Sequence, residues 1–297
     1  MPPWLLPYQQ KLSRLLAANQ LVHGILLTGP VGIGKHQLAS WLASSLLCVN
    51  QNKPCGNCKS CLLLAAGSHA DYLAVDSSGS TIGVDAIRQL SQFMHGRAQQ
   101  QLNKVVVLGD ADKLTEAAAN ALLKTLEEPS QNSFIILYCS AASALPSTVL
   151  SRCQQWQLAA EFGDDAKHWL LQHSNRAAPE FLLTYCAGGP LKALALLESG
   201  EADTLQLAVQ YLQQFVGSKI SLNDCVKHLE QVNGLSKLLG WFLTEQLQLK
   251  DKVSEPQRVL AIHQLYSRWC RDESQILGQN KQLALSAFLV ELKRLHG

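Results

Sequence analysis

The sequence has few aromatic residues, little excess of either charge and no long apolar run. Phe, Trp and Tyr make up 6% of the 297 residues, and the formal net charge is +2. A free-standing nucleic-acid-binding domain usually carries a strongly basic face, so this composition argues against that class. No run approaches the roughly 20 apolar residues of a membrane-spanning helix, and residues 1–7 lack the basic segment of a signal peptide. We therefore expect a cytoplasmic protein that does not contact a membrane.

A phosphate-binding motif is present but lacks one residue. Residues 29–35 read GPVGIGK and fit the pattern G-x-x-x-x-G-K. In such loops, backbone N–H groups and a helix N-terminus surround a phosphate, and the lysine reaches the outer phosphates. The hydroxyl residue that normally follows the lysine and binds Mg²⁺ is replaced by His36. The motif predicts a strand, a loop and a helix with a weakened nucleotide site, whose candidate residues are Gly29, Gly32, Gly34 and Lys35.

Four of the nine cysteines lie in one polar segment, residues 48–61, with the spacing C-x6-C-x2-C-x2-C. Short spacings with turn residues between them allow one segment to close a tetrahedral Zn²⁺ site, although chance clustering or redox chemistry is an alternative. A site closed by four protein ligands is structural, because it keeps no open position for a substrate. The predicted zinc ligands are Cys48, Cys55, Cys58 and Cys61. We expect His69 to be a bystander and the other cysteines to pack as small hydrophobic residues.

The first 158 residues alternate short apolar runs with amphipathic segments, which is typical of a parallel α/β sheet. The expected strands are residues 25–27, 71–75, 104–108, 133–138 and 156–158, and the expected helices are residues 8–18, 37–47, 84–94 and 116–128. Beyond residue 158 the β-branched runs disappear and helical patterns dominate. The breaks in these helical patterns fall at residues 188–190, 217–218, 234 and 254–256.

This organisation predicts one α/β domain followed by two helical domains. The α/β domain spans residues 1–158 and contains the cysteine insertion at 48–61. A small helical domain at 159–202 and a larger one at 203–297 follow it.

Two further segments carry residues that suit phosphate chemistry. The strand at 104–108 runs into Gly109-Asp110-Ala111-Asp112, where either aspartate suits the Mg²⁺ shell of an ATPase and Asp112 alternatively caps the next helix. Arg152 follows a short turn, from which an arginine can stabilise phosphate charge in a neighbouring subunit. An isolated arginine is, however, more often a surface ion-pair residue.

Together these segments resemble the AAA+ clamp-loader subunits of bacterial DNA polymerase III. The resemblance covers residues 1 to about 200 and extends to the C-terminal helices only by length and composition. It is carried by LVHG at 21–24, GPVGIGK at 29–35, the four-cysteine insertion, ANALLKTLEEP at 119–129 and SRC at 151–153. The resemblance implies a AAA+ domain, a helical lid and a C-terminal collar domain that assembles with other loader subunits in a five-membered ring.

The resemblance also implies that the nucleotide site is degenerate. Aligned on ANALLKTLEEP, Gly109 stands where the Mg²⁺-binding aspartate is expected and Asp110 where the catalytic glutamate is expected. In the lid, Leu191 replaces the arginine that senses the γ-phosphate, with Lys192 next to it as an alternative cation. Ser140 occupies the polar sensor position. Loss of both protein ligands of the metal removes several kcal/mol of transition-state stabilisation.

The resemblance therefore implies a subunit that hydrolyses ATP poorly or not at all and binds ATP or ADP weakly at most. Arg152 is then expected to act in trans as an arginine finger for an adjacent ATPase subunit. The expected partners are gamma/tau-type and delta-type loader subunits, with the sliding clamp and primer-template DNA reached through the complex during DNA replication. An active motor-type ATPase subunit is the first alternative, supported by the complete GxxxxGK. A zinc-bearing nucleic-acid-binding module is the second, and the near-neutral charge opposes it.

Overall fold

The computed structural model describes residues 1–77, 81–100, 103–249, 256–275 and 280–296. The chain forms two compact units, of which the first comprises residues 1–176 and 186–194 and the second residues 177–185 and 195–297. The division into three domains that we infer from the sequence stays a prediction. Within the described residues, no helix combines the length and the apolar composition needed to cross a membrane.

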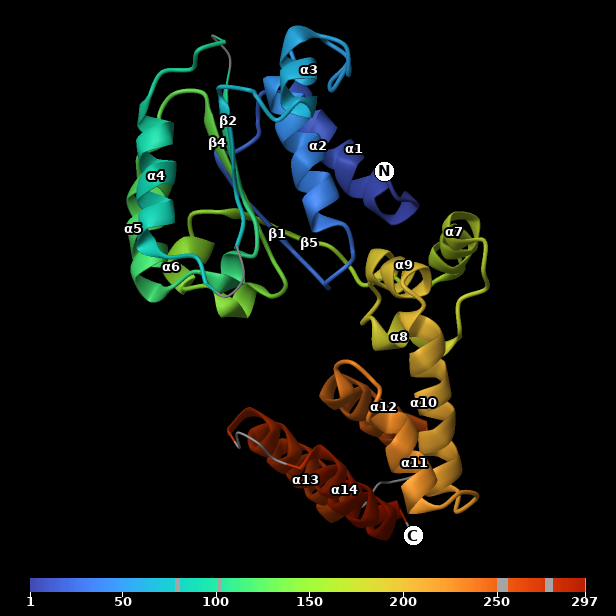
Figure 1. Cartoon of the computed structure of the whole chain (residues 1–297). Coiled ribbons are helices and arrows are strands. Elements are labelled where there is room, and N and C mark those ends of the chain that lie inside the picture. Colours follow the sequence, from blue (N-terminus) through green and yellow to red (C-terminus); the bar gives the residue numbers. More distant parts are fainter. Residues whose placement is uncertain (78–80, 101–102, 250–255, 276–279, 297) are drawn as a thin grey trace. The chain divides into compact units, whose positions relative to one another are not determined.

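A five-stranded parallel sheet forms the centre of the first unit (Figure 1). The strands are β1 (Gly24–Thr28), β2 (Tyr72–Val75), β3 (Lys104–Leu108), β4 (Ser133–Cys139) and β5 (Gln154–Gln157), and their order in the sheet is β2-β3-β4-β1-β5. All the strand pairs are parallel, as the alternation of strands and helices predicts. The bounds predicted for the last strand, 156–158, were wrong. The strand begins two residues earlier because the polar Gln154 and Gln155 pair with β1 at the edge of the sheet, where burial on both faces is not required.

Helices cover both faces of this sheet (Figure 1). Successive side chains of a strand point to opposite faces, so Ile25 and Leu27 pack with α1 (Leu6–Ala17) and α2 (Lys35–Leu47). Leu26 faces the other side, where α4 (Val84–His95), α5 (Glu116–Glu127) and α6 (Ser147–Leu150) pack. Because both faces are buried, the carboxyl ends of the strands and the loops that follow them form the accessible edge. Ligands of open parallel sheets bind at this edge.

The remaining elements of the first unit connect or extend this core. They are η1 (Pro3–Leu5), α3 (Lys59–Ala65), η2 (Ala111–Lys113), η3 (Ala142–Ala144), α7 (Asp164–Ser174) and the first residues of α9 (Pro190–Glu198). Thr115 caps α5, because its side chain accepts a hydrogen bond from the Ala118 N–H. The alternative in which Asp112 caps this helix was therefore wrong.

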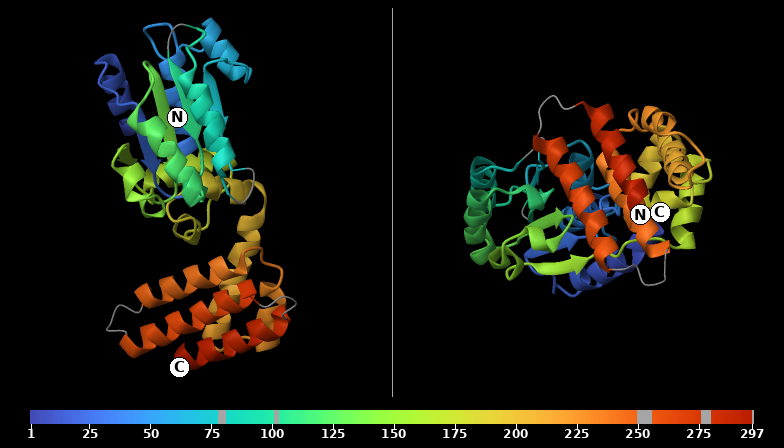
Figure 2. Two further views of the ribbon diagram at one scale, coloured as in Figure 1. Left: turned by 90° about the vertical axis from the view of Figure 1, so that its left-hand side faces the viewer. Right: turned by 90° about the horizontal axis from the view of Figure 1, so that it is seen from below.

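The described residues of the second unit form helices joined by turns and short loops. It contains α8 (Phe181–Tyr185), the rest of α9, α10 (Glu201–Val216), α11 (Leu222–Leu229), α12 (Leu235–Leu249), α13 (Pro256–Gln275) and α14 (Lys281–His296). Figure 2 shows α12, α13 and α14 running side by side. The chain breaks near 188–190, 217–218 and 234 as predicted, and the predicted turn at 254–256 lies mostly outside the described residues.

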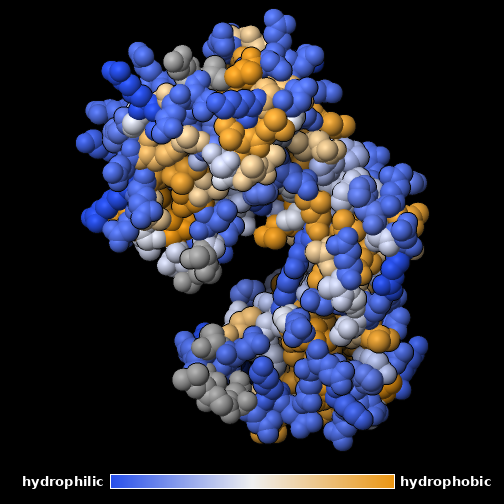
Figure 3. Space-filling model, turned by 45° about the horizontal axis from the view of Figure 1, so that its top comes forward, coloured by the Kyte–Doolittle hydropathy of each residue, from blue (hydrophilic) through white to orange (hydrophobic). Residues whose placement is uncertain are grey.

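Exposed apolar side chains occur in both units. Val31 and Leu62 in the first unit are 60% and 58% exposed, and Leu283 in the second is 70% exposed. On the face shown in Figure 3, hydrophobic residues are interspersed with hydrophilic ones. Single exposed apolar residues are common on folded proteins and do not by themselves identify a partner.

Candidate functional site

The phosphate-binding motif folds as a loop between β1 and α2. The loop residues predicted to bind nucleotide lie together after Thr28, and α2 begins at Lys35. Gly34 precedes that helix with a φ of 104°, a left-handed conformation that glycine adopts without strain. The predicted strand, loop and helix are therefore present, with the helix N-terminus directed at the loop.

Lys35 is bound to its own loop. Its Nζ donates to the carbonyl oxygens of Gly29 at 2.6 Å and Pro30 at 2.8 Å. The side chain is buried, and burial lowers the pKa of this lysine from its ordinary value. The Ile33 N–H also donates to the Pro30 carbonyl, at 3.2 Å. The Lys35 ammonium and the Ile33 N–H are thus hydrogen-bonded within the loop, and a phosphate that binds to either donor has to displace these contacts.

Neighbouring segments of the same unit close over the loop. The Trp4 Nε1–H donates to the Ile33 carbonyl at 2.8 Å, and the Leu191 N–H donates to the Gly32 carbonyl at 2.9 Å. A Cβ atom placed on Gly32 would lie 2.5 Å from the Cβ of Lys192. Lys192, the alternative cation of the lid, therefore approaches the loop with its backbone and Cβ. The start of α9 packs directly on the phosphate-binding loop.

The position expected for the Mg²⁺-binding aspartate is filled by other side chains. A Cβ atom on Gly109 would lie 2.1 Å from Asp76 Oδ1 and 2.4 Å from the Tyr138 hydroxyl oxygen. The Tyr138 hydroxyl donates to Asp76 Oδ1 at 3.1 Å. Burial is the main cause that raises the pKa of Tyr138, and the negative charge of Asp76 adds to it. The His36 ring stands perpendicular to the Tyr138 ring, with 6.0 Å between their centroids. The side chains of β2 and β4 thus occupy the space beside Gly109.

Sequence reasoning missed Asp76 and Tyr138 as members of this site. Asp76 directly follows the strand at residues 72–75, and Tyr138 lies next to the last residue of β4. Their position at the carboxyl ends of two predicted strands was the available signal, because parallel strands bring these ends to one edge of the sheet.

Asp110 forms an ion pair within its own loop. It accepts hydrogen bonds from Lys113 Nζ at 2.9 Å and from the Ser77 hydroxyl at 2.8 Å. The hydrogen bond from Lys113 is the main reason that the pKa of Asp110 lies below its ordinary value, and the bond from Ser77 adds to it. A general base works best with a pKa near the working pH. The surroundings of Asp110 move its pKa in the opposite direction.

The predicted sensor residue lies at the same edge of the sheet. Ser140 follows β4 and is exposed, and its N–H donates to Asp112 Oδ2 at 3.4 Å. Asp112 thus contacts the sensor position through the backbone of Ser140.

Arg152 lies just after the short helix α6 and is one-third exposed. Its Nη2 contacts Glu127 Oε1 at 2.5 Å, and its Nη1 donates to the Thr148 carbonyl at 2.8 Å and to the Ser151 hydroxyl at 3.2 Å. The short turn that was predicted to carry this arginine is present. The ion-pair partner, Glu127, was not predicted.

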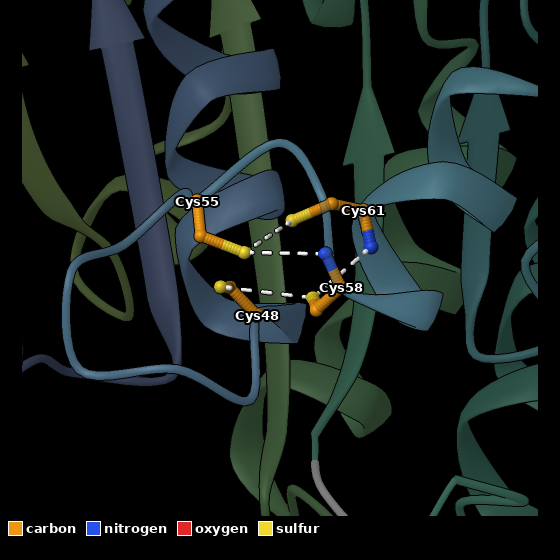
Figure 4. Close-up of side chains that lie close together, drawn as sticks. All are labelled: Cys48, Cys55, Cys58 and Cys61. Carbon is orange, nitrogen blue, oxygen red and sulfur yellow. Dashed lines mark hydrogen bonds between the residues drawn. The ribbon is translucent and has the colours of Figure 1, made fainter.

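The four cysteines of the insertion converge on one point (Figure 4). Their sulfur atoms lie within 4.8 Å of one another, and the Cys48–Cys58 and Cys55–Cys61 sulfurs are each 3.9 Å apart. Two bonds of about 2.3 Å at a tetrahedral angle separate their sulfurs by about 3.8 Å, whereas a disulfide needs about 2.05 Å. The cluster therefore has the spacing of a metal site and not of a disulfide.

Backbone N–H groups around the cluster favour thiolates. The Cys58 N–H donates to Cys55 Sγ at 3.3 Å, and the Cys61 N–H donates to Cys58 Sγ at 3.5 Å. The bond from Cys61 is the main cause that lowers the pKa of Cys58 to about 6, while burial raises the pKa of Cys61 to about 12. His69 lies outside the cluster, since its Nε2 contacts the Ser60 hydroxyl at 3.2 Å and its Nδ1 accepts from the Asp71 N–H.

The chain is similar to subunits of DNA polymerase III. Residues 7–162 match the family described as DNA polymerase III, delta subunit. DNA polymerase III subunit delta' of Haemophilus influenzae is 36% identical over 256 residues, which cover 83% of this chain and 78% of that protein. The subunit delta' of Pseudomonas aeruginosa is 33% identical over 299 aligned positions, which cover 97% of this chain and 90% of that protein.

A solved structure has the same fold along most of the chain. The DNA polymerase III gamma subunit-related protein of Thermotoga maritima covers 96% of this chain and 99% of its own, with a TM-score of 0.54 and 17% identity. This likeness, the parallel sheet and the helical C-terminal region confirm the predicted AAA+ fold class. The family match and the sequence relatives confirm the resemblance found in the motifs: the chain belongs to the DNA polymerase III delta' family.

Proposed function

We propose that this chain is a non-hydrolysing subunit of the DNA polymerase III clamp loader and helps to load the sliding clamp onto primed DNA. It assembles with ATPase subunits of the gamma/tau type and with a delta-type subunit in a five-membered ring. It reaches the clamp and primer-template DNA through that complex. Membership of the delta' family supports this assignment, as does the similarity to subunit tau of Bacillus subtilis, which is 32% identical over 147 residues.

The space beside Gly109 is the observation that carries the non-hydrolysing part of the proposal. Asp76 and Tyr138 lie where an aspartate at position 109 would place its side chain. His36 replaces the hydroxyl ligand, and Lys35 donates to loop carbonyls. Phosphoryl transfer depends on Mg²⁺ and lysine to neutralise charge on the transferring group. A loop with neither metal ligand supports weak ATP or ADP binding at most.

Arg152 is the residue that serves catalysis in this proposal. It acts in trans, as an arginine finger that contacts the phosphate charge at the ATP site of an adjacent subunit. Its place after α6, its partial exposure and its anchored guanidinium support this role, since an arginine finger has to reach a neighbour in a defined orientation.

The four-cysteine cluster holds a structural Zn²⁺, supported by its donor set and its sulfur separations.

The test is the DNA-stimulated ATPase rate of the loader reconstituted from this chain and its partner subunits. An arginine finger contributes about 10³–10⁵ to kcat at the site it completes, so Arg152→Ala should lower the rate of the complex severalfold. Arg88→Ala is the matched control, because Arg88 is an exposed arginine that pairs with Asp85 on α4. An unchanged rate with Arg152→Ala would overturn the finger role, and brisk Mg²⁺-dependent turnover by the chain alone would favour a motor-type ATPase.

A further inference from the structure

Three segments that are far apart in the sequence meet beside Arg152. His23 Nε2 contacts the Leu126 carbonyl oxygen at 2.8 Å, next to Glu127 at the C-terminal end of α5. Gly24 begins β1, and a Cβ atom there would lie 2.9 Å from the Arg152 carbonyl oxygen and 3.4 Å from Leu126 Cδ2. The start of β1 and the end of α5 therefore fix the backbone that carries the arginine.

The side chain of Arg152 is held from two directions. Glu127 Oε1 contacts Nη2 at 2.5 Å, while the Thr148 carbonyl and the Ser151 hydroxyl accept from Nη1 at 2.8 and 3.2 Å. A guanidinium has five N–H donors in one plane, and these contacts occupy three of them. Two nitrogens anchored on different partners define the direction of that plane. The arginine is thus oriented within its own subunit.

The location of Glu127 gives it no evident role in its own helix. It is the last residue of α5, where the helix dipole disfavours a negative charge. A cation beside this helix end offsets the charge, and Arg152 is the cation that forms an ion pair with Glu127. The carboxylate therefore lies where it is unfavourable for the helix but suited to holding the arginine.

We propose that Glu127 is a positioning residue that orients the Arg152 guanidinium for the ATP site of the neighbouring subunit. This inference rests on the proposed finger role of Arg152. A long arginine side chain loses much rotamer freedom when it is immobilised, and Glu127 supplies that ordering before the subunits meet. With side chains 33% and 47% exposed, such an ion pair changes an equilibrium constant by about fivefold at most. That is far below the rate contribution of an arginine finger, so Glu127 orients the guanidinium without withholding it from phosphate.

The test compares Glu127→Gln with Glu128→Gln in the reconstituted loader. Glu128 is the matched control, because it is an exposed carboxylate one residue further along that forms no ion pair with Arg152 within the described residues. We expect Glu127→Gln to lower the kcat of the DNA-stimulated ATPase by up to about fivefold, and by less than Arg152→Ala does, while the KM for ATP changes less than about twofold. Glu128→Gln should match the wild type. Size-exclusion chromatography and thermal unfolding should show that both variants assemble and fold alike.

The double variant separates positioning from a general structural effect. If Glu127 acts through Arg152, Arg152→Ala combined with Glu127→Gln should be as slow as Arg152→Ala alone, because the partner is already absent. Additive losses, a faster Glu127→Gln complex, or equal rates for Glu127→Gln and Glu128→Gln would overturn the inference while leaving the finger role intact. An unchanged rate with Arg152→Ala alone would instead overturn the proposed function, so the two failures are distinguishable.

Discussion

Placing the expected metal ligand at position 109 should not restore metal binding. A Gly109→Asp substitution recovers the expected metal ligand in sequence, but its Cβ would lie within 2.4 Å of both Asp76 Oδ1 and the Tyr138 hydroxyl oxygen. Overpacking of this kind costs about 1–3 kcal/mol, and the new carboxylate also faces that of Asp76. We expect Gly109→Asp to lower the free energy of unfolding by that amount, measured by chemical denaturation, and to add no Mg²⁺-dependent nucleotide binding.

Gly83→Asp is the matched control for this change. Gly83 precedes α4 with a φ of −82°, and a Cβ atom there meets nothing within 4 Å. Aspartate is a favoured residue before a helix, so stability should be unchanged or higher. A Gly109→Asp protein as stable as Gly83→Asp would show that Asp76 and Tyr138 readily make room.

Asp110 allows a test of charge alone. Its φ of 47° is left-handed, a conformation that asparagine tolerates, so Asp110→Asn removes the charge with little backbone strain. The pKa of Asp110 is lowered in the folded protein, chiefly by Lys113. The carboxylate therefore stabilises the fold above the ordinary aspartate pKa of about 3.9, and this contribution is lost as the pH falls through the lower folded value.

The expected effect of Asp110→Asn is small because the Asp110 side chain is 49% exposed. Wild type should be more stable than the variant by up to about 1 kcal/mol at pH 7, and the difference should shrink below pH 4. Denaturant unfolding at pH 7 and pH 3 measures it. A difference that is equal at both values would mean that the ion pair with Lys113 contributes nothing.

At the scale of the element, the insertion should depend on its metal. Cys58 also precedes α3, where its sulfur accepts from the Cys61 N–H, so one residue serves both the cluster and the helix. Changing Cys55 and Cys58 to Ser together should reduce the zinc content of the purified protein to background. Loss of a structural metal should also lower the free energy of unfolding by about 4 kcal/mol or more.

Cys270→Ser is the control for the cysteine variant, because Cys270 lies on α13 in the other unit. Elemental analysis and thermal unfolding measure both effects. A double variant that keeps its zinc would remove the cluster from consideration as the binding site.

The sequence was sufficient for strands whose burial is two-sided. The runs at 104–108 and 133–138 are predominantly apolar and form strands of the central sheet. The cysteine spacing likewise lies within one short segment, which is why the cluster could be predicted. In each case the deciding residues are neighbours in the chain.

The features that were missed or misplaced depend on contacts between distant segments. A strand was predicted near β5, but its start was misplaced because its first residues, Gln154 and Gln155, are polar and are defined by their pairing with β1. Asp76 and Tyr138 are 62 residues apart and meet only because β2 and β4 end at the same edge of one sheet. Glu127 and Arg152 meet because α5 and α6 pack on the same face. A sequence pattern supplies candidates at the strand ends, whereas the tertiary fold decides which of them touch.

At the scale of the whole molecule, the charge is almost balanced, with 25 Lys and Arg against 23 Asp and Glu. Binding of DNA by an isolated protein depends strongly on released counterions and thus on clustered positive charge. A nearly neutral chain is better suited to contact DNA as part of a larger complex. Nucleotide binding and hydrolysis are therefore the properties to measure on the separate chain, with and without metal.

The isolated chain should show no Mg²⁺-dependent gain in nucleotide affinity. In an active site of this class, the metal bridges phosphate oxygens and protein ligands, so chelating it weakens binding. Here His36 replaces one ligand, and Asp76 with Tyr138 occupies the space of the other. Titration of ATP by calorimetry, first with Mg²⁺ and then with EDTA, should give equally weak or undetectable binding, with no phosphate release in either case. Tight binding that EDTA abolishes would mean that Lys35 leaves the loop carbonyls and that metal ligands come from residues other than those expected.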